Sequence, residues 1–311
     1  MATITLNSGF QMPVIGLGVW RMEKSSIETS FSIPSRLAIT ISTVLQITRA
    51  RQKLEKLFQK HLGLGLCRGR SFLSQQRPLW NSDHGHVLEA CKDSLRKLQL
   101  DYLDLYLVHF PIASKHTGVG TNGSAFDKDG MLDIDTTISL ETTWHAMEDL
   151  ASLGLVRSIG ISNYDIFLTR DCLAYSKVKP AVNQVESHPY FQRDSLLKFC
   201  QKQGICVTAH NPLGGALANT LRFGSVSCLD DPVLLELAKK YKKSLVQIAL
   251  RWGIQRKMVV IPKTLKAERL EENFRVWDFE LSEEDMDNIQ SMDKKYRANL
   301  PVKAWGIDPY A

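Results

Sequence analysis

A chain of 311 residues with 44% hydrophobic and 23% charged residues has the length and composition of one large globular domain. No apolar run is long enough to span a membrane and the N-terminus lacks the features of a signal peptide, so we expect a cytoplasmic protein without a membrane partner. The net charge of +6 does not indicate a nucleic-acid-binding face, because residues 31–80 hold nine basic residues against one acidic residue, a balance of +8 that leaves the remainder at −2.

Predicted strands and helices alternate along most of the chain. A hairpin is expected at residues 2–12, a first strand at 14–20 and a helix at 85–98. From Asp101 onward, short apolar runs rich in β-branched residues precede amphipathic stretches. The further expected strands are 103–108, 157–161, 180–183, 205–209 and 258–262, and the further expected helices are 139–153, 165–175, 193–203, 232–241, 244–254 and 266–275.

Strands that are almost continuously apolar and are separated by helices indicate a parallel sheet covered on both faces. A Rossmann fold is disfavoured because no G-x-G-x-x-G follows a strand. We therefore predict an α/β fold, a (β/α)₈ TIM barrel formed by a single domain over residues 1–311. The six cysteines contain no C-x-x-C pair, which predicts free, mostly buried thiols and no metal site.

Polar residues follow five of the expected strands. In a barrel these positions lie at the carboxyl ends of the strands, where catalytic residues gather. Each residue also has a simpler explanation, as a helix cap, a structural histidine or a solvated loop charge, but five strands ending this way favour a common site. The residues are His109, Ser162, Asn163, Gln184, His210 and Lys263.

At these positions the chain resembles the aldo-keto reductase family. Residues 147–163 and 261–273 resemble the mid-chain and C-terminal signatures of the family, and Leu107-Val-His109 and Pro212-Leu-Gly-Gly215 also match. The resemblance covers residues 1–31 and 79–311. Within the family the chain is most similar to the plant aldose-6-phosphate reductases, through residues 80–86, 169–176 and 305–311.

The resemblance implies NADPH-dependent reduction of an aldehyde, expected to be an aldose 6-phosphate, by a monomer or weak homodimer. His109 would orient the substrate carbonyl, Trp20 would line the pocket, and Lys115, His116 and Lys303 are candidates for the phosphate or are simply solvated charges. Amide and hydroxyl groups suit a nicotinamide carboxamide, and cations suit the 2′-phosphate of NADP(H). The residues implied in cofactor binding are Ser162, Asn163, Gln184, His210, Pro212, Leu213, Lys263, Thr264, Arg269, Glu272 and Asn273.

The proton donor of the family is missing from residues 32–78. The family has a Tyr as acid in an Asp-x-Ala-x-x-Tyr run, supported by a Lys that lowers its pKa. Here Thr43, Thr48 and Arg77 occupy the positions of the Asp, the Tyr and the Lys. A strand-like composition at residues 37–45 and a helix-like one at 53–61 would still allow a complete-looking backbone.

A frameshift accounts for the missing residues. One set of codons for Thr43–Arg49, ACT GTG CTG CAG ATT ACA AG, regroups with a preceding G into GAC TGT GCT GCA GAT TAC AAG, which encodes Asp-Cys-Ala-Ala-Asp-Tyr-Lys. In the same frame Gln75-Gln-Arg77 regroups into Thr-Thr-Lys. We infer a frameshift that opens near Phe31-Ser32 and closes near Arg77-Pro78.

Three explanations stay open for this segment: an error in the gene sequence or gene structure, a pseudogene, or a diverged protein that uses the altered residues. The expected activity of the chain is impaired reduction. The alternative is a non-catalytic NADPH-binding protein, because the implied cofactor residues lie outside the altered segment.

Overall fold

A ring of parallel strands stands at the centre of the protein. The computed structural model describes residues 2–18, 40–44, 72–77, 84–98, 100–117, 125–215, 225–264 and 266–310. Within these residues an eight-stranded sheet runs in chain order. Its strands are β3 (Gly16–Gly18), β4 (Thr40–Val44), β5 (Phe72–Arg77), β6 (Leu103–Val108), β7 (Val156–Ser162), β8 (Val182–Glu186), β9 (Cys206–His210) and β10 (Val259–Val260).

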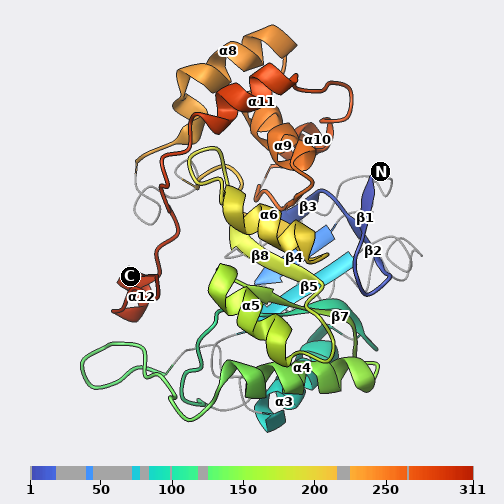
Figure 1. Ribbon diagram of the computed structural model, residues 1–311, viewed down its shortest axis with the longest axis vertical. Coiled ribbons are helices and arrows are strands. Elements are labelled where there is room, and N and C mark those ends of the chain that lie inside the picture. Colours follow the sequence, from blue (N-terminus) through green and yellow to red (C-terminus); the bar gives the residue numbers. More distant parts are fainter. Residues whose placement is uncertain are drawn as a thin grey trace.

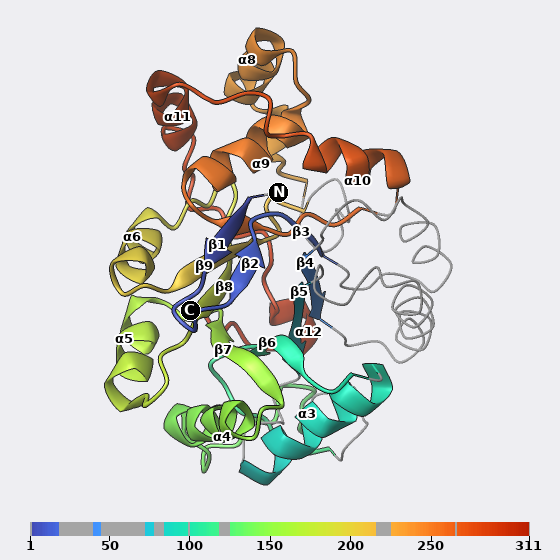
Figure 2. The same cartoon turned by 90° about the vertical axis from the view of Figure 1, so that its right-hand side faces the viewer.

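The sheet closes on itself, which confirms the predicted barrel. All seven pairings between neighbouring strands are parallel. The two edge strands meet through a parallel bridge between Ile15 and Val260. Val260 N donates to Val14 O at 3.0 Å, and Gly18 N donates to Pro262 O at 3.0 Å. Figure 2 shows this ring with helices around it.

The predicted N-terminal hairpin is also confirmed. β1 (Thr3–Thr5) and β2 (Gln11–Pro13) pair antiparallel and lie across one end of the ring (Figure 2). Leu6 and Met12 are buried against strand residues of the barrel interior. Ser8 Oγ lies 2.8 Å from Ser158 Oγ, on β7. The hairpin thus closes the end of the barrel opposite to the carboxyl ends of the strands.

The predicted helices of the described residues form within two residues of their expected limits, and caps explain where several of them begin. Ser139 and Asp165 accept hydrogen bonds from Thr142 N and Leu168 N, and Ser244 forms a capping box with Gln247. The α-helices, labelled in Figure 1, are α3 (His84–Leu98), α4 (Leu140–Ser152), α5 (Ile166–Tyr175), α6 (Asp194–Lys202), α8 (Pro232–Tyr241), α9 (Leu245–Gln255), α10 (Ala267–Phe274), α11 (Glu283–Gln290) and α12 (Val302–Trp305). A 3₁₀ helix, η1 (Cys228–Asp230), precedes α8.

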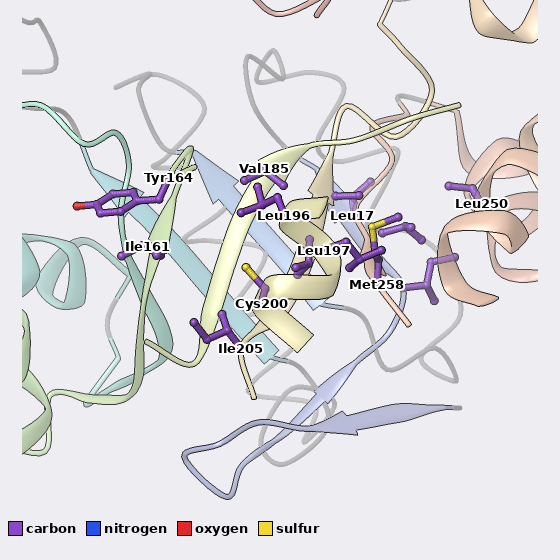
Figure 3. Packing of buried hydrophobic residues seen from close by; sticks show 14 of the residues in the cluster. Leu17, Ile161, Tyr164, Val185, Leu196, Leu197, Cys200, Ile205, Leu250 and Met258 are labelled. Atoms are coloured by element: carbon purple, nitrogen blue, oxygen red, sulfur yellow. The ribbon is translucent and has the colours of Figure 1, made fainter. Parts of the chain in front are cut away.

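The main core lies between the strands and the helices. Figure 3 shows Leu196, Leu197 and Cys200 of α6 facing Val185 of β8. The five cysteines that the structure describes are buried, as predicted, and none of them forms a disulfide bond with another described cysteine. Burial raises the pKa of the Cys206 thiol to about 12, so it packs as a small apolar group. None of the described helices is both long and apolar enough to cross a bilayer.

Gly160 lets β7 approach β8 closely. A Cβ atom there would stand 2.6 Å from Val182 O and 2.7 Å from Leu107 Cδ2. We expect Gly160→Ala to lower the free energy of unfolding by roughly 1–3 kcal/mol, because the carbonyl belongs to the sheet and cannot move aside. Urea denaturation of both variants would compare it with Gly253→Ala, whose Cβ would stand 2.8 Å from a methyl group of Val260. An equal or smaller loss for Gly160→Ala would contradict this account.

Candidate functional site

The carboxyl ends of the central strands bring the predicted residues together. Ser162 is paired with Gln184 across β7 and β8, and Glu186 with His210 across β8 and β9. His109 follows directly after β6. The polar residues predicted from the strand ends therefore line one end of the barrel, where chemistry occurs in this class of fold.

Asn163 is at the centre of this group. Its Nδ2 donates to His109 O at 2.8 Å and to Ser162 Oγ at 3.1 Å, and Ser162 Oγ donates to Gln184 O at 2.7 Å. The backbone of Asn163 has a φ of 65°, a left-handed conformation that Asn tolerates better than most residues. The carboxamide is thus held rigidly, with its Oδ1 left to accept hydrogen bonds from other groups.

Two of these groups contact Asn163 Oδ1. His210 Nε2 lies 3.4 Å from it, and the hydroxyl of Tyr310 donates to it at 3.2 Å. Sequence reasoning missed Tyr310, which lies in the tail after α12 and only becomes part of the site through folding. Phe110 and Trp305 hold that tail in place with their rings 4.7 Å apart, centroid to centroid.

Both histidines of the site are neutral at pH 7. Burial, with the charge of His210 as a smaller cause, lowers the pKa of His109 to about 3. Burial is also the largest cause that lowers the pKa of His210 to about 4, where the carboxylate of Glu186 opposes the shift and the guanidinium groups of Arg297 and Arg193 add to it. Neutral His109 can orient a carbonyl by hydrogen bonding, but its imidazole is not in the protonated form that would act as an acid.

Glu186 is a buried carboxylate that the strand pattern did not predict. Its Oε1 accepts hydrogen bonds from Asn211 Nδ2 at 2.9 Å and from the backbone N–H groups of Ala298 and Asn299 at 3.1 Å, and lies 3.3 Å from His188 Nε2. Burial opposes ionisation most strongly, but the hydrogen bond and charge of His188, with contributions from His210 and Asn211, lower the pKa of Glu186 to about 2. Glu186 therefore joins the site to the C-terminal tail.

The predicted cofactor residues occupy two further places. Buried Pro212 and half-buried Leu213 follow β9 in a turn completed by Gly214. After β10, Lys263 lies beside Gly18 of β3, its Cβ 3.7 Å from where a Cβ of that glycine would stand. Buried Thr264 leads to α10, which carries exposed Arg269, half-buried Glu272 and buried Asn273.

The predicted substrate residues are less uniformly placed. Lys115 Nζ forms a salt bridge with Asp133 at 3.0 Å. The ring of His116 stacks on that of His86 at 3.7 Å, and partial burial and the neighbouring His86 lower the pKa of His116. Lys303 belongs to the short helix α12.

The altered positions of residues 32–78 fall partly outside the described residues. Thr48 lies outside them, as does Trp20, the predicted pocket residue that precedes the segment. The backbone of Thr43 belongs to β4, where it pairs with Gln75. Arg77 is the last residue of β5 and is paired with Val108, the residue before His109. The backbone of these two positions thus reaches the carboxyl end of the barrel.

Comparison with known proteins places this arrangement in a family. The chain is 56% identical to the NADP-dependent D-sorbitol-6-phosphate dehydrogenase of Malus domestica over 311 residues, which cover all of both chains. It is 35% identical to aldo-keto reductase family 1 member A1 of Homo sapiens over 301 residues, 96% of this chain and 91% of the relative. The aldose reductase of Schistosoma japonicum superposes with a TM-score of 0.88 at 32% identity, covering 100% and 98% of the two chains. The model of the aldo/keto reductase family matches residues 79–294. The chain belongs to the aldo-keto reductase family.

Proposed function

We propose that this protein has the scaffold of an NADPH-dependent reductase that converts the aldehyde of an aldose 6-phosphate to an alcohol, and that its present residues 32–78 impair the reaction. The observation that carries the proposal is the hydrogen-bonded group of Ser162, Asn163, Gln184 and His210 beside His109 at the carboxyl end of the barrel. The similarity to an NADP-dependent sorbitol-6-phosphate dehydrogenase supports the cofactor and the substrate class.

The residues present fit a nicotinamide cofactor. Asn163 and Gln184 carry amide groups of the kind that match a carboxamide, and Asn163 Oδ1 would exchange its contacts with Tyr310 and His210 for the ligand. The half-buried ring of His210 can stack on a flat heterocycle. Lys263 precedes α10 and Arg269 belongs to it, and the two cations would hold a 2′-phosphate there. When bound, the cofactor supplies the hydride. His109 orients the substrate carbonyl as a neutral hydrogen-bond partner.

Reduction of a carbonyl also needs a proton, and the described residues of the site do not supply a tuned acid. His109 is neutral at pH 7, because its pKa is about 3. Burial is the largest cause that raises the pKa of the Tyr310 hydroxyl to about 12, which makes it a weaker acid than an ordinary tyrosine. Thr43 and Thr48, at the family positions of the Asp and the Tyr, cannot act as acids at neutral pH.

The altered segment replaces family sequence rather than being inserted into it. The family model begins to match at residue 79, directly after the segment. The Malus relative nevertheless covers all of this chain and is covered entirely by it. Two compensating shifts of the reading frame would preserve the length in this way. Sequencing the transcript across codons 30–80 would decide whether the altered frame is real.

The cations beside α10 yield a prediction about cofactor choice. We expect Arg269→Met to weaken NADPH binding by about 10–100-fold and to leave NADH binding unchanged, because a charged hydrogen bond to the 2′-phosphate contributes roughly 1.5–3 kcal/mol. Calorimetric titration with both cofactors would measure this. Arg275→Met is the matched control, since exposed Arg275 ends the same helix and lies 3.4 Å from Glu271. Equal losses for NADPH and NADH would show that Arg269 does not contact the 2′-phosphate.

A second candidate is a non-catalytic NADPH-binding protein. It is favoured by the distribution of the residues, since the candidate cofactor side chains lie between Ser162 and Asn273 and the altered catalytic positions lie between Thr43 and Arg77. Saturable NADPH binding without aldehyde-dependent oxidation, in a chain whose altered frame is confirmed in the transcript, would favour this candidate. Turnover of an aldose phosphate would exclude it.

A further inference from the structure

Two guanidinium groups lie against one buried aromatic ring near the candidate site. Arg193, in the loop between β8 and α6, has its Cζ 5.1 Å from the centroid of the Phe191 ring. Arg297, in the tail before α12, has its Cζ 4.7 Å from the same centroid and 3.5 Å from that of Tyr310. The ring of Phe191 is only 8% exposed. Both guanidinium groups are therefore fixed in position by stacking.

Neither guanidinium forms a salt bridge with a carboxylate of the described residues. Glu186, which is near enough to act on Arg193 electrostatically, is already engaged with His188, Asn211 and two backbone N–H groups. Burial and, next to it, the charge of Arg297 lower the pKa of Arg193 to about 10. Two half-buried like charges repel each other, and a bound anion would relieve this repulsion.

The pair also stands close to the reacting end of the barrel. The hydroxyl of Tyr310, whose ring stacks on Arg297, donates to Asn163 Oδ1 at 3.2 Å. The charges of both arginines act on His210. The backbone beside Arg297 is held by Glu186, since Ala298 and Asn299 are its hydrogen-bond donors. An anion between the guanidinium groups would thus lie beside the site rather than on a separate face.

Two of the cations predicted from the sequence, Lys115 and His116, fit a phosphate less well. Lys115 is engaged by Asp133, and His116 is stacked on His86 with a lowered pKa, so it does not offer a full positive charge at neutral pH. Arginine, in contrast, keeps its charge and binds phosphate oxygens through two parallel N–H donors.

We propose that Arg193 and Arg297 form the subsite that binds the phosphate group of the sugar substrate, with Phe191 and Tyr310 as the platform that holds the two guanidinium planes. The identity of the ligand as a sugar phosphate rests on the proposed function. The same chemistry could also serve the pyrophosphate of the cofactor, so the experiment must separate these two sources.

The test is a binding measurement, because binding does not depend on the missing proton donor. The full chain, saturated with NADP⁺, is titrated calorimetrically with glucitol 6-phosphate, with glucitol and with inorganic phosphate, and the cofactor-free chain is titrated with NADP⁺. We expect Arg297→Met to weaken the binding of glucitol 6-phosphate and of inorganic phosphate by about 10–100-fold, and to leave the affinities for glucitol and for NADP⁺ unchanged. Arg297→Lys should recover only part of the loss, because a lysine lacks the planar pair of donors.

Arg157→Met is the matched control. Arg157 also stacks on an aromatic ring, with its Cζ 3.9 Å from the centroid of Tyr102, but it is paired with Asp104 on β6 and lies beside Phe10 of the N-terminal hairpin. It should change none of the four affinities. Circular dichroism of each variant would verify that it is folded.

Each outcome decides between the alternatives. If Arg297→Met weakens NADP⁺ binding as much as phosphate binding, the pair serves the cofactor, and the proposal is wrong. Unchanged affinities in every titration would show that the arginines are structural only. If the chain without the arginine substitutions binds inorganic phosphate through Arg297 but discriminates against glucitol 6-phosphate, the anion subsite stands and the proposed substrate fails.

Discussion

Restoring the reading frame of residues 32–78 is expected to raise the rate of aldose phosphate reduction by roughly 10²–10⁴-fold, the contribution of one positioned acid. The restored chain carries Thr43→Asp, Thr48→Tyr and Arg77→Lys together with the in-frame neighbours of these positions. The backbones of Thr43 and Arg77 already lie at or next to the carboxyl ends of β4 and β5. The restored side chains would therefore be attached to the backbone at the same end of the barrel as His109 and Asn163.

Steady-state oxidation of NADPH, measured with glucose 6-phosphate and with glucose, compares the two proteins. A third protein, restored at every position except Thr48, separates recovery of the fold from recovery of the acid. It should fold like the restored chain and react as slowly as the unrestored one. If the unrestored chain is folded and reduces the sugar phosphate at a comparable rate, another group supplies the proton and the frameshift explanation of the site is wrong.

Replacing Glu186 is expected to produce the largest loss of stability of any single change at the site. Glu186 is fully buried and joins β8 to the backbone of Ala298 and Asn299, 112 and 113 residues later in the chain. Glu186→Ala removes the acceptor of the buried Ala298 N–H, of the half-buried Asn299 N–H and of His188, so we expect the free energy of unfolding to fall by about 3–5 kcal/mol. Urea denaturation measures the loss, and Glu236→Ala, at an exposed position of α8, should change it by less than about 0.5 kcal/mol.

The pH dependence of stability gives an independent test of the same carboxylate. The pKa of Glu186 is lowered in the folded protein to about 2 from its ordinary value of 4.5. Its stabilising contribution is therefore fully present above pH 4.5 and is lost as the pH falls from 4.5 towards 2. In Glu186→Ala the stability should depend less steeply on pH in this window. An unchanged slope would mean that folding does not shift the pKa of this carboxyl.

Local patterns were sufficient to predict most of the strands and helices. The run Leu103–Val108 became β6, with His109 directly after it as expected. The strand expected at residues 180–183, with Gln184 after it, ends later than predicted, because Gln184, Val185 and Glu186 continue β8 and pair with Thr208, Ala209 and His210. A charged glutamate usually indicates that a buried strand has ended. Glu186 continues the strand because distant residues hydrogen-bond to its carboxylate, and the sequence alone does not reveal these partners.

Helix α11 was also missed, for a different reason. Its sequence from Glu283 to Gln290 is mostly polar and offers little apolar periodicity. The cap formed by Ser282 with Asp285 N was the available signal. The arginine pair and Tyr310 could not be predicted from any local pattern, because Arg193 and Arg297 come from different loops and meet only at Phe191.

The altered segment shows how backbone and chemistry separate. Thr40–Val44 is rich in β-branched residues and occupies the place of a barrel strand as β4. A strand of a barrel needs mainly suitable backbone hydrogen bonds and compatible packing, which many sequences provide. A proton donor needs one particular side chain at one position. On the proposed function, the barrel is therefore complete in its strand order while the reaction lacks its acid.

The most direct test of the central claim is a paired measurement on one preparation of the unrestored chain, which keeps residues 32–78 as they stand. The two measurements are calorimetric titration with NADPH and aldehyde-dependent oxidation of NADPH with glucose 6-phosphate. The account predicts saturable binding at one site, because Ser162, Asn163, Gln184 and His210 are in place. It predicts oxidation at least 10²-fold slower than that of the frame-restored chain. A folded protein that does not bind NADPH, or one that oxidises it at the rate of the restored chain, would contradict the account.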